Sequence, residues 1–470
     1  MQQVKSSRLY IYAVSGIAAL AGLLFGFDTG IISGALLFIQ KDFVISTGMK
    51  ELIVSSVLLG AMIGSLSSGR LTDHFGRRRL ILFVSGFFII GTLITSFATQ
   101  VTTIIFGRLF IGLAIGMGSY TAPLYIAEVA PFELRGALVS LNQLAITLGI
   151  LGSYLINFAF SNFDASWRWM FGIGLIPACL LSIGMTFLPE SPRWLVKKNR
   201  LNDAHAILKK LRAKSDVTEE MTEIKNSLVM KQASFSEIFS PWILPVLFLG
   251  ATMGFIQQVT GINTIIYYAP TIFQLAGLED ASSSILATVG IGMVNVLATV
   301  FAVFYLDVLG RRPLLLTGMI GMGACLLALS IAFRFGTQSA YLPWIAITST
   351  FVYIVCFAFS LGTMLWLVIS ELFPLEVRAT AMSVAIFSCW FWNFVVSSTF
   401  LTLLDYFGPS NTFLIYGMLC VFSIIFCYYK VPETKGITLE QIEENIRKRV
   451  PLRELGQPGQ LIEASETTSG

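Results

Sequence analysis

The sequence predicts an all-α membrane protein in which twelve transmembrane helices form two similar six-helix halves, arranged as parallel repeats. Hydrophobic residues make up 55% of the 470 positions and charged residues only 12%, an apolar content that a water-soluble protein could not bury. Apolar stretches of about 20 residues, long enough to cross a hydrocarbon core of roughly 30 Å, recur along the chain. Three motifs of the first half return in the second.

Short polar loops separate these apolar stretches and set the approximate limits of the helices. The predicted spans are 11–39, 51–70, 79–98, 102–125, 137–160, 168–188, 242–275, 284–306, 313–334, 342–370, 379–404 and 411–429. The first stretch follows a basic N-terminal run, but it contains Asp28 and continues without a small-residue cleavage site. It is therefore predicted to be a helix and not a signal peptide.

Lysine and arginine predict the orientation, because cytoplasmic loops are enriched in these residues. Of the 31 basic residues, only Lys41, Lys50, Arg168 and Arg334 fall in loops on the side opposite the termini. Both termini are therefore predicted to be cytoplasmic. The short external loops contain no N-x-S/T sequence, which favours a bacterial inner membrane over a eukaryotic cell surface.

The chain is predicted to divide into four parts. Two six-helix halves, 10–190 and 241–432, flank a cytoplasmic linker at 191–240, and a cytoplasmic tail follows at 433–470. Within the linker, LNDAHAILKKLRA alternates apolar and basic faces at helical spacing, which predicts a short amphipathic helix near the membrane surface. The last 20 residues are rich in Gly, Ser, Thr and Glu and are predicted to be disordered.

Motifs that repeat between the halves support the duplication. GRLTDHFGRRR, AEVAPFELRGA and PESPRW begin at residues 69, 127 and 189, and they return as YLDVLGRRP, SELFPLEVRATA and PETKG at residues 305, 370 and 432. Six spans in each repeat place equivalent loops on the same side of the membrane. The halves are therefore predicted to be related by an axis along the membrane normal.

The repeated loop motifs place acids and arginines at the ends of neighbouring helices. A partly desolvated ion pair there can hold one conformation closed, so the motifs predict a cytoplasmic gate. Its predicted members are Asp73, Arg77, Glu128, Arg135 and Glu190 in the first half, and Arg311, Glu371 and Arg378 in the second. We expect the arginines of each half to pair with its acids. The alternative is that the basic residues only anchor the loops on the cytoplasmic side.

Two ionisable residues lie deep within the predicted spans. Asp28 lies in LLFGFDTGIISG and Arg108 in IIFGRLFIG. A charge at a helix centre costs on the order of 2.5–3.5 kcal/mol in a membrane, so these residues are functional candidates and are expected to pair. The alternatives are a static structural pair and a neutral aspartic acid.

Polar residues line one face of the predicted helix at 242–275. Gln257, Thr260, Asn263 and Tyr267 fall within about 120° of one another around the helix axis, and nearby glycines and Pro270 permit bending. Amides, hydroxyls and an aromatic face suit a ligand with several hydroxyl groups. Gln258 points away from this face unless the helix unwinds.

Several motifs together resemble the sugar porter family of the major facilitator superfamily. They are GRxxDxxGRR, PLYIAEVAPFELRG, PESPRWL, QQVTGIN, ELFPLEVRA and PETKG, and the resemblance covers about residues 10–440. It implies the major facilitator fold and alternating access. A carboxylate at the place of Asp28 with the arginine at Arg108 resembles the proton-coupling pair of symporters, whereas facilitative members usually carry a neutral residue there.

The resemblance also implies a sugar site. The implied sugar contacts are Gln143, Gln257, Gln258, Asn263, Asn295 and Trp366, and the implied cavity lining is Phe25, Ile146, Tyr267, Gly362, Cys389 and Trp390. Two positions depart from the family pattern. Cys389 stands where an amide is common, and Ile150 stands where a xylose-transporting relative has a glutamine, so each lacks a hydrogen-bonding group. Glucose, galactose, xylose and arabinose all remain open.

These observations predict a secondary active transporter that imports a monosaccharide, a hexose or a pentose, together with a proton. A passive facilitator is the main alternative, and a sugar sensor or an enzyme has less support. The six cysteines and two histidines show no metal-ligand spacing, and no phosphate-binding loop or nucleophile motif occurs. We expect no metal, no cofactor and no nucleic-acid partner; the partners are sugar, proton and the lipid bilayer, and the protein is expected to be a monomer.

Overall fold

The structure is a computed structural model that describes residues 2–212, 216–229, 235–335, 340–374 and 376–457, and these contain helices but no β-strand. Twelve helical spans in the described residues are long and apolar enough to cross a membrane, which confirms the predicted number. Each of the twelve spans could be located from hydropathy, because hydropathy depends only on residues that are near one another in the sequence.

The first half contains six spans. They are α1 (Gln2–Asp42), α2 (Thr47–Phe75), α3 (Arg77–Ser96), α4 (Val101–Val129), α5 (Arg135–Phe160, preceded by the 3-10 turn η1, Phe132–Leu134), and the pair α6 (Ser166–Gly172) and α7 (Leu175–Phe187). The helices continue beyond the predicted apolar limits. For example, α2 extends several residues past both ends of the stretch 51–70, because helical hydrogen bonding continues into the polar loops.

The second half repeats this order. Its helices are α11 (Leu244–Val259), α12 (Ile262–Leu275), α13 (Ala281–Leu309), α14 (Arg311–Phe335), α15 (Leu342–Phe359), α16 (Met364–Leu372), α17 (Arg378–Ser397) and α18 (Phe400–Lys430). The predicted span 379–404 is interrupted between Ser397 and Phe400. The helix that follows, α18, bends at Gly408, where φ is 75°, directly before Pro409.

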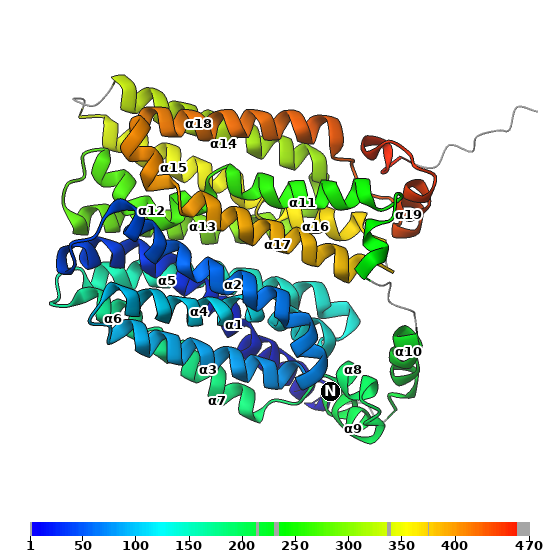
Figure 1. Ribbon diagram of the computed structural model, residues 1–470. Coiled ribbons are helices and arrows are strands. Elements are labelled where there is room, and N and C mark those ends of the chain that lie inside the picture. Colours follow the sequence, from blue (N-terminus) through cyan, green and yellow to red (C-terminus); the bar gives the residue numbers. More distant parts are fainter. Residues whose placement is uncertain (1, 213–215, 230–234, 336–339, 375, 458–470) are drawn as a thin grey trace, which may run out of the picture.

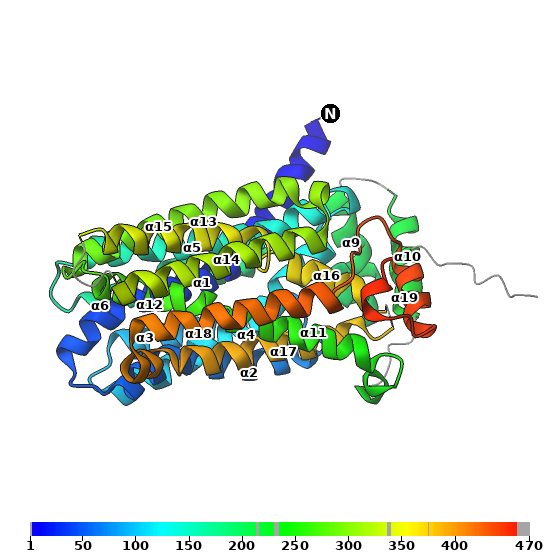
Figure 2. The same cartoon turned by 90° about the horizontal axis from the view of Figure 1, so that it is seen from above.

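The two halves lie side by side with their helices running roughly along one common direction (Figure 1). The N-terminus, the helices α8–α10 of the linker and the tail helix α19 gather toward one end of the bundle in both views (Figures 1 and 2). We call this the linker end and the opposite end the far end. Across the boundary between the halves, α5 contacts α13, α2 contacts α17 and α1 contacts α12.

Two spans of the second half are interrupted in their middle. Between α11 and α12 the chain breaks at Thr260 and Gly261, where Gly261 has φ 93°, a conformation that a side chain would strain. Between α15 and α16 the chain leaves the helix around Ser360. Irregular backbone at membrane depth is tolerated where it is enclosed by protein or lines a polar space.

The linker forms a small helical unit on the first half. It contains α8 (Pro192–Lys197), α9 (Leu201–Arg212) and α10 (Thr218–Val229), and the apolar face of α9 packs into a cluster with α8 and α10. The 3-10 turn η2 (Phe235–Phe239), which follows in the linker, contacts α11 and α17 of the second half. Arg212 donates to the terminal carbonyl of Val129 at 2.8 Å and pairs with Glu220 at 2.7 Å. A cation at the C-terminus of α4 complements the helix dipole.

The tail is more ordered than predicted. Helix α19 (Leu439–Arg447) is followed by η3 (Leu452–Glu454), and Asn445 donates to the carbonyl oxygen of Leu455 at 2.9 Å. The prediction of disorder is therefore wrong for residues 451–457, because buried Leu455 and this hydrogen bond anchor them. The remaining part of that prediction, residues 458–470, lies outside the described residues.

Close helix packing inside the first half generates a prediction. A Cβ atom on Gly26 would lie 1.8 Å from the carbonyl oxygen of Ile146, whereas one on Gly16, in the same helix α1, would meet nothing within 4 Å. Gly26→Ala should therefore separate α1 from α5 and destabilise the protein by about 1–3 kcal/mol. The matched control Gly16→Ala should be neutral or slightly stabilising. Thermal unfolding in detergent measures both, and equal melting temperatures for the two variants would contradict the packing.

Candidate transport site

Asp28 and Arg108 meet in the interior of the first half. Arg108 Nη1 lies 3.2 Å from Asp28 Oδ1, and Nη2 lies 3.4 Å from Oδ2. Arg108 has no exposed surface and Asp28 is 2% exposed. The guanidinium also donates from Nε to the carbonyl oxygen of Ile53 at 2.7 Å, and the Phe171 ring lies 5.8 Å from it. The predicted pair therefore exists, and α2 helps to hold it.

The geometry gives Arg108 partners that do not depend on the charge of Asp28. The carbonyls of α2 and the face of Phe171 remain available if the carboxylate becomes protonated. Burying an unpaired guanidinium is otherwise very costly. This arrangement therefore permits Asp28 to gain and lose a proton without exposing Arg108 to the membrane interior.

A polar cluster surrounds the break between α11 and α12. Gln257 Nε2 donates to the carbonyl oxygen of Leu361 at 3.0 Å, in the interrupted segment before α16. Asn263 Nδ2 donates to Gln258 Oε1 at 2.7 Å across the break. The Cys389 thiol lies 3.0 Å from Gln258 Nε2 and 3.2 Å from Gln257 Oε1. The unwound backbone thus brings Gln258 to the same cluster as its neighbours, although an unbroken helix would point it away.

The other predicted sugar contacts lie on helices that pack around this cluster. Asn295 on α13 is buried, while Gln143 on α5 and Trp366 on α16 are partly buried. Within the described part of the chain, neither amide forms a hydrogen bond with a protein group. Both amides therefore keep free donors and acceptors in the described part of the chain.

The predicted lining residues are also placed in the interior. Phe25 of the first half and Trp390 of the second approach to 5.6 Å between ring centroids, so this contact joins the halves beside the polar cluster. Tyr267 is 3% exposed and Cys389 is 9% exposed, and Ile146 and Gly362 are partly buried. Ile150 is buried on α5 and offers no polar group.

The sequence interpretation missed one polar residue of this region. Asn393 on α17 is 5% exposed, and its Oδ1 accepts from Ser397 Oγ at 3.1 Å. An asparagine within an apolar predicted span was the available signal. Its place on α17, one turn from Trp390, extends the polar cluster toward α12.

At the linker end, Glu128 and Arg77 form the centre of a network in the first half. Arg77 Nε lies 2.8 Å from Glu128 Oε2, and Arg77 Nη2 donates to Glu128 Oε1 at 2.9 Å. Ser191 Oγ also donates to Glu128. Asp73 pairs with Lys197 at 2.9 Å and more distantly with Arg77 at 3.7 Å. The network joins α2, α3, α4 and the linker.

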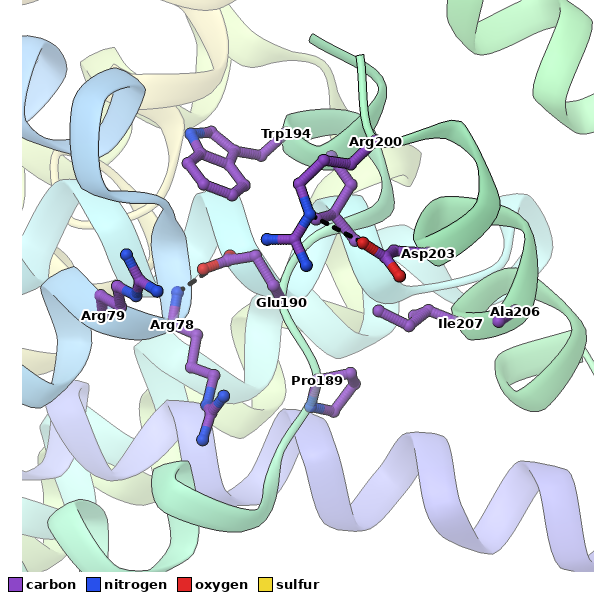
Figure 3. A pocket seen from close by; sticks show the side chains of 10 residues that line it. Arg78, Arg79, Pro189, Glu190, Trp194, Arg200, Asp203, Ala206 and Ile207 are labelled. Atoms are coloured by element: carbon purple, nitrogen blue, oxygen red, sulfur yellow. Dashed lines mark hydrogen bonds and ion pairs between the residues drawn. The ribbon is translucent and has the colours of Figure 1, made fainter. Parts of the chain in front are cut away.

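Glu190 caps the N-terminus of α3 in the same network. Its Oε1 accepts from the backbone N–H groups of Arg77, Arg78 and Ser191 at 2.8–3.1 Å. Burial raises the pKa of Glu190, although these hydrogen bonds oppose the shift. Figure 3 shows Glu190 beside a pocket of about 360 Å³ that is also lined by Trp194, Arg200 and Asp203.

The second half repeats the central contacts of this network. Arg311 Nη2 lies 3.1 Å from Glu371 Oε1, and Thr434 donates to the other oxygen of Glu371. Glu433 accepts from the backbone N–H groups of Arg311 and Arg312 at 3.0 Å. Glu433 was absent from the predicted gate, although its equivalence to Glu190 follows from the repeated PE dipeptide.

Two predicted gate residues do not form the expected pairs. Within the described residues, Arg135 lies over the Phe132 ring at 5.7 Å and Arg378 donates to the carbonyl oxygen of Phe373 at 3.0 Å, and neither pairs with an acid of its half's network. The reason is that both oxygens of Glu128 and of Glu371 already have partners. Arg378 instead faces the acids of α19, while burial lowers its pKa.

The linker-end networks brace each half separately. Among the described residues, the ion pairs at this end lie within one half, lie within the linker or the tail, or join a half to its adjacent linker or tail. Hydrogen bonds between the halves lie toward the far end instead, for example Tyr154 Oη to the carbonyl oxygen of Ile266 at 3.0 Å and Ser161 to Ser282 at 3.2 Å.

Comparison with known proteins places this geometry in a family. The family model described as "Sugar (and other) transporter" matches residues 14–446. The chain belongs to this sugar transporter family. It is 42% identical to the galactose-proton symporter of Escherichia coli (strain K12) over 97% of this chain and 98% of that protein. It is 40% identical to a D-xylose transporter of Levilactobacillus brevis over 96% and 97% of the two chains.

Solved structures of the sugar transporter family share the fold. The inward open conformation of the xylose transporter XylE from E. coli is 32% identical and gives a TM-score of 0.82, covering 93% of this chain and 99% of that one. The XylE structure bound to 6-bromo-6-deoxy-D-glucose gives 0.77 at the same coverage. The chain is therefore a multi-pass membrane protein with the major facilitator fold.

The buried network predicts a large stability difference between two acids. Glu128→Gln weakens the pair with Arg77, whose side chain is only 8% exposed, so it should cost up to about 3–5 kcal/mol. The control Glu444→Gln removes an exposed pair with Lys448 and should cost about 0–1 kcal/mol. Thermal unfolding in detergent measures both. Comparable losses would show that the Glu128 network does not brace the first half.

Proposed function

We propose that this sugar transporter imports a monosaccharide together with a proton by alternating access. The observation that carries the proposal is the buried pair of Asp28 and Arg108 in the first half, because α1, which carries Asp28, packs against α12, which carries Asn263 of the amide cluster. Relatives named as galactose-proton and arabinose-proton symporters, 42% and 38% identical along nearly the whole chain, support this assignment.

The linker end faces the cytoplasm in this proposal. Most of the basic residues lie in the linker, the tail and the loops at that end, and cytoplasmic loops of membrane proteins carry an excess of Lys and Arg. The protein then lies in a bacterial cytoplasmic membrane with both termini inside. The far end is extracellular, and a structure joined at the far end is inward-facing.

Sugar recognition rests on amides from both halves. Gln143 and Asn295 supply free hydrogen-bonding groups, and Gln257, Gln258 and Asn263 supply an ordered amide cluster. Phe25 and Trp390 supply aromatic faces for the C–H surface of a sugar ring. Because the contacts come from both halves, a bound sugar can change the relative stability of the open and closed arrangements of the halves.

In the proposed coupling, the protonation state of Asp28 decides whether Arg108 is held by the Asp28 carboxylate or only by the backbone carbonyls of α2. The ionised Asp28 carboxylate holds the guanidinium, whereas a proton on Asp28 releases that charge and leaves Arg108 to the carbonyls of α2. Sugar and proton are coupled if each favours the same conformational step. A facilitator without proton coupling is the second candidate, although it would give the buried Asp28 no function.

Asp28→Asn should abolish sugar accumulation against a concentration gradient while sugar exchange partly survives, because an amide cannot carry the proton cycle. Uptake by proteoliposomes under an imposed pH gradient, compared with exchange without a gradient, separates the two activities. Asp203→Asn, which changes an exposed acid of the linker, is the control and should retain both. If the Asp28 variant still concentrates sugar, the coupling role is excluded.

Gln143→Ala tests the sugar site without disturbing protein contacts. Because the Gln143 amide has no protein partner in the described residues, its loss should leave the melting temperature unchanged. Loss of one sugar hydrogen bond should raise the half-saturating sugar concentration about tenfold. Uptake of labelled glucose, galactose, xylose and arabinose gives the measurement and ranks the substrates. Gln100→Ala, at an exposed position, is the control; equal affinities for both variants would exclude Gln143.

A further inference from the structure

At the far end, two side chains of α2 bond the start of α18 in the opposite half. Glu51 Oε1 accepts the backbone N–H of Thr402 at 2.7 Å, and Glu51 Oε2 accepts the Thr402 hydroxyl at 2.7 Å. One turn earlier in α2, Thr47 Oγ1 donates to Asp405 Oδ2 at 2.6 Å. We call Thr47, Glu51, Thr402 and Asp405 the far-end latch. Neither the proton pair nor the sugar site includes any of them.

Glu51 takes the place of a missing helix cap. The first N–H groups of a helix have no partner inside the helix, and a carboxylate there is favoured by hydrogen bonding and by the helix dipole. The N-cap residue of α18, Thr399, makes no capping hydrogen bond with its side chain. Glu51 supplies that acceptor from the other half of the protein.

Separating Glu51 from the start of α18 would leave a buried carboxylate without its hydrogen-bond donors. Glu51 is 3% exposed, and among the described residues no lysine or arginine pairs with it; Asp405 carries the same charge. The buried carboxylate of Glu51 is therefore stabilised by Thr402 and by the N-terminus of α18. Both partners move away together if the far end opens, so the capping exists only while the halves are joined there.

We propose that Glu51 is a positioning residue for transport: it latches α2 to α18 and holds the far end closed in the inward-facing state. The latch complements the linker-end networks, which act within one half and do not have to break when the halves rock. It must break and reform in every transport cycle. The cyclic role rests on the proposed alternating access, but the contact itself is a property of the fold.

A distance measurement across the far end tests the latch. Phe97→Cys and Phe335→Cys place spin labels on exposed positions at the far ends of α3 and α14, one in each half, with exposed Cys179 replaced by serine. Double electron–electron resonance on the full chain in nanodiscs then reports the populations of short and long separations. No sugar or pH gradient is required.

Glu51→Ala should raise the ratio of open to closed far ends about fivefold or more, as expected for the loss of a charged hydrogen-bond acceptor. Thr402→Val removes only the hydroxyl contact and should produce a smaller shift in the same direction. Asp164→Asn changes another exposed far-end acid that lies outside the latch and should leave the distribution unchanged.

An unchanged distance distribution in both Glu51→Ala and Thr402→Val would overturn the latch. If Glu51→Ala does not fold, Glu51→Gln and Thr402→Val supply the test, because each retains part of the cap. A lower melting temperature without a population shift would make Glu51 merely structural, which also contradicts the proposal. The spin labels detect opening of the far end and not sugar uptake. The test of the latch therefore stays valid even if the proteoliposome experiments show no proton coupling.

Discussion

The buried pair of Asp28 and Arg108 is the constraint around which the first half is organised. A guanidinium with no exposed surface needs charged and polar partners, and here they come from α1 and α2 while Arg108 itself lies on α4. Three helices must therefore meet at one depth in the membrane. The carbonyl of Ile53 matters as much as the carboxylate for this purpose, because it gives Arg108 a partner that does not depend on the charge of Asp28. The proton-coupling role that we propose for Asp28 requires such a partner.

Rigid halves and a separable boundary follow from where the remaining polar contacts lie. Glu128 and Glu371 use both of their oxygens inside their own halves and the adjoining linker or tail, and Glu190 and Glu433 cap helices of those halves. These contacts can persist while the halves rock against each other. Hydrogen bonds between the halves lie toward the far end. This distribution divides the structure into two bodies and a reversible boundary, which is what alternating access requires.

Local patterns predicted much of this structure. Hydropathy located the twelve spans, and the energetic cost of membrane charge identified Asp28 and Arg108 as a pair. The predictions that failed depended on competition between distant groups. Arg135 and Arg378 lie close in the sequence to Glu128 and Glu371. In the structure, however, these two acids pair with Arg77 and Arg311. The bond of Glu51 to Thr402 joins residues 351 positions apart with no repeating pattern between them.

The break in α11–α12 connects the proton pair to the sugar cluster in physical terms. At Thr260 and Gly261 the backbone leaves the helix, so Gln258 and Asn263 bond each other and their amides lie in a shared cluster with Cys389. Helix α12, which follows the break, packs against α1, the helix that carries Asp28. In the proposed coupling, a change in the Asp28–Arg108 pair would reach the amides through the contact between α1 and α12 and through the break at Thr260 and Gly261. The second half carries the ordered amides and the first half carries the charged pair, so the proposed coupling has to cross the boundary between the halves.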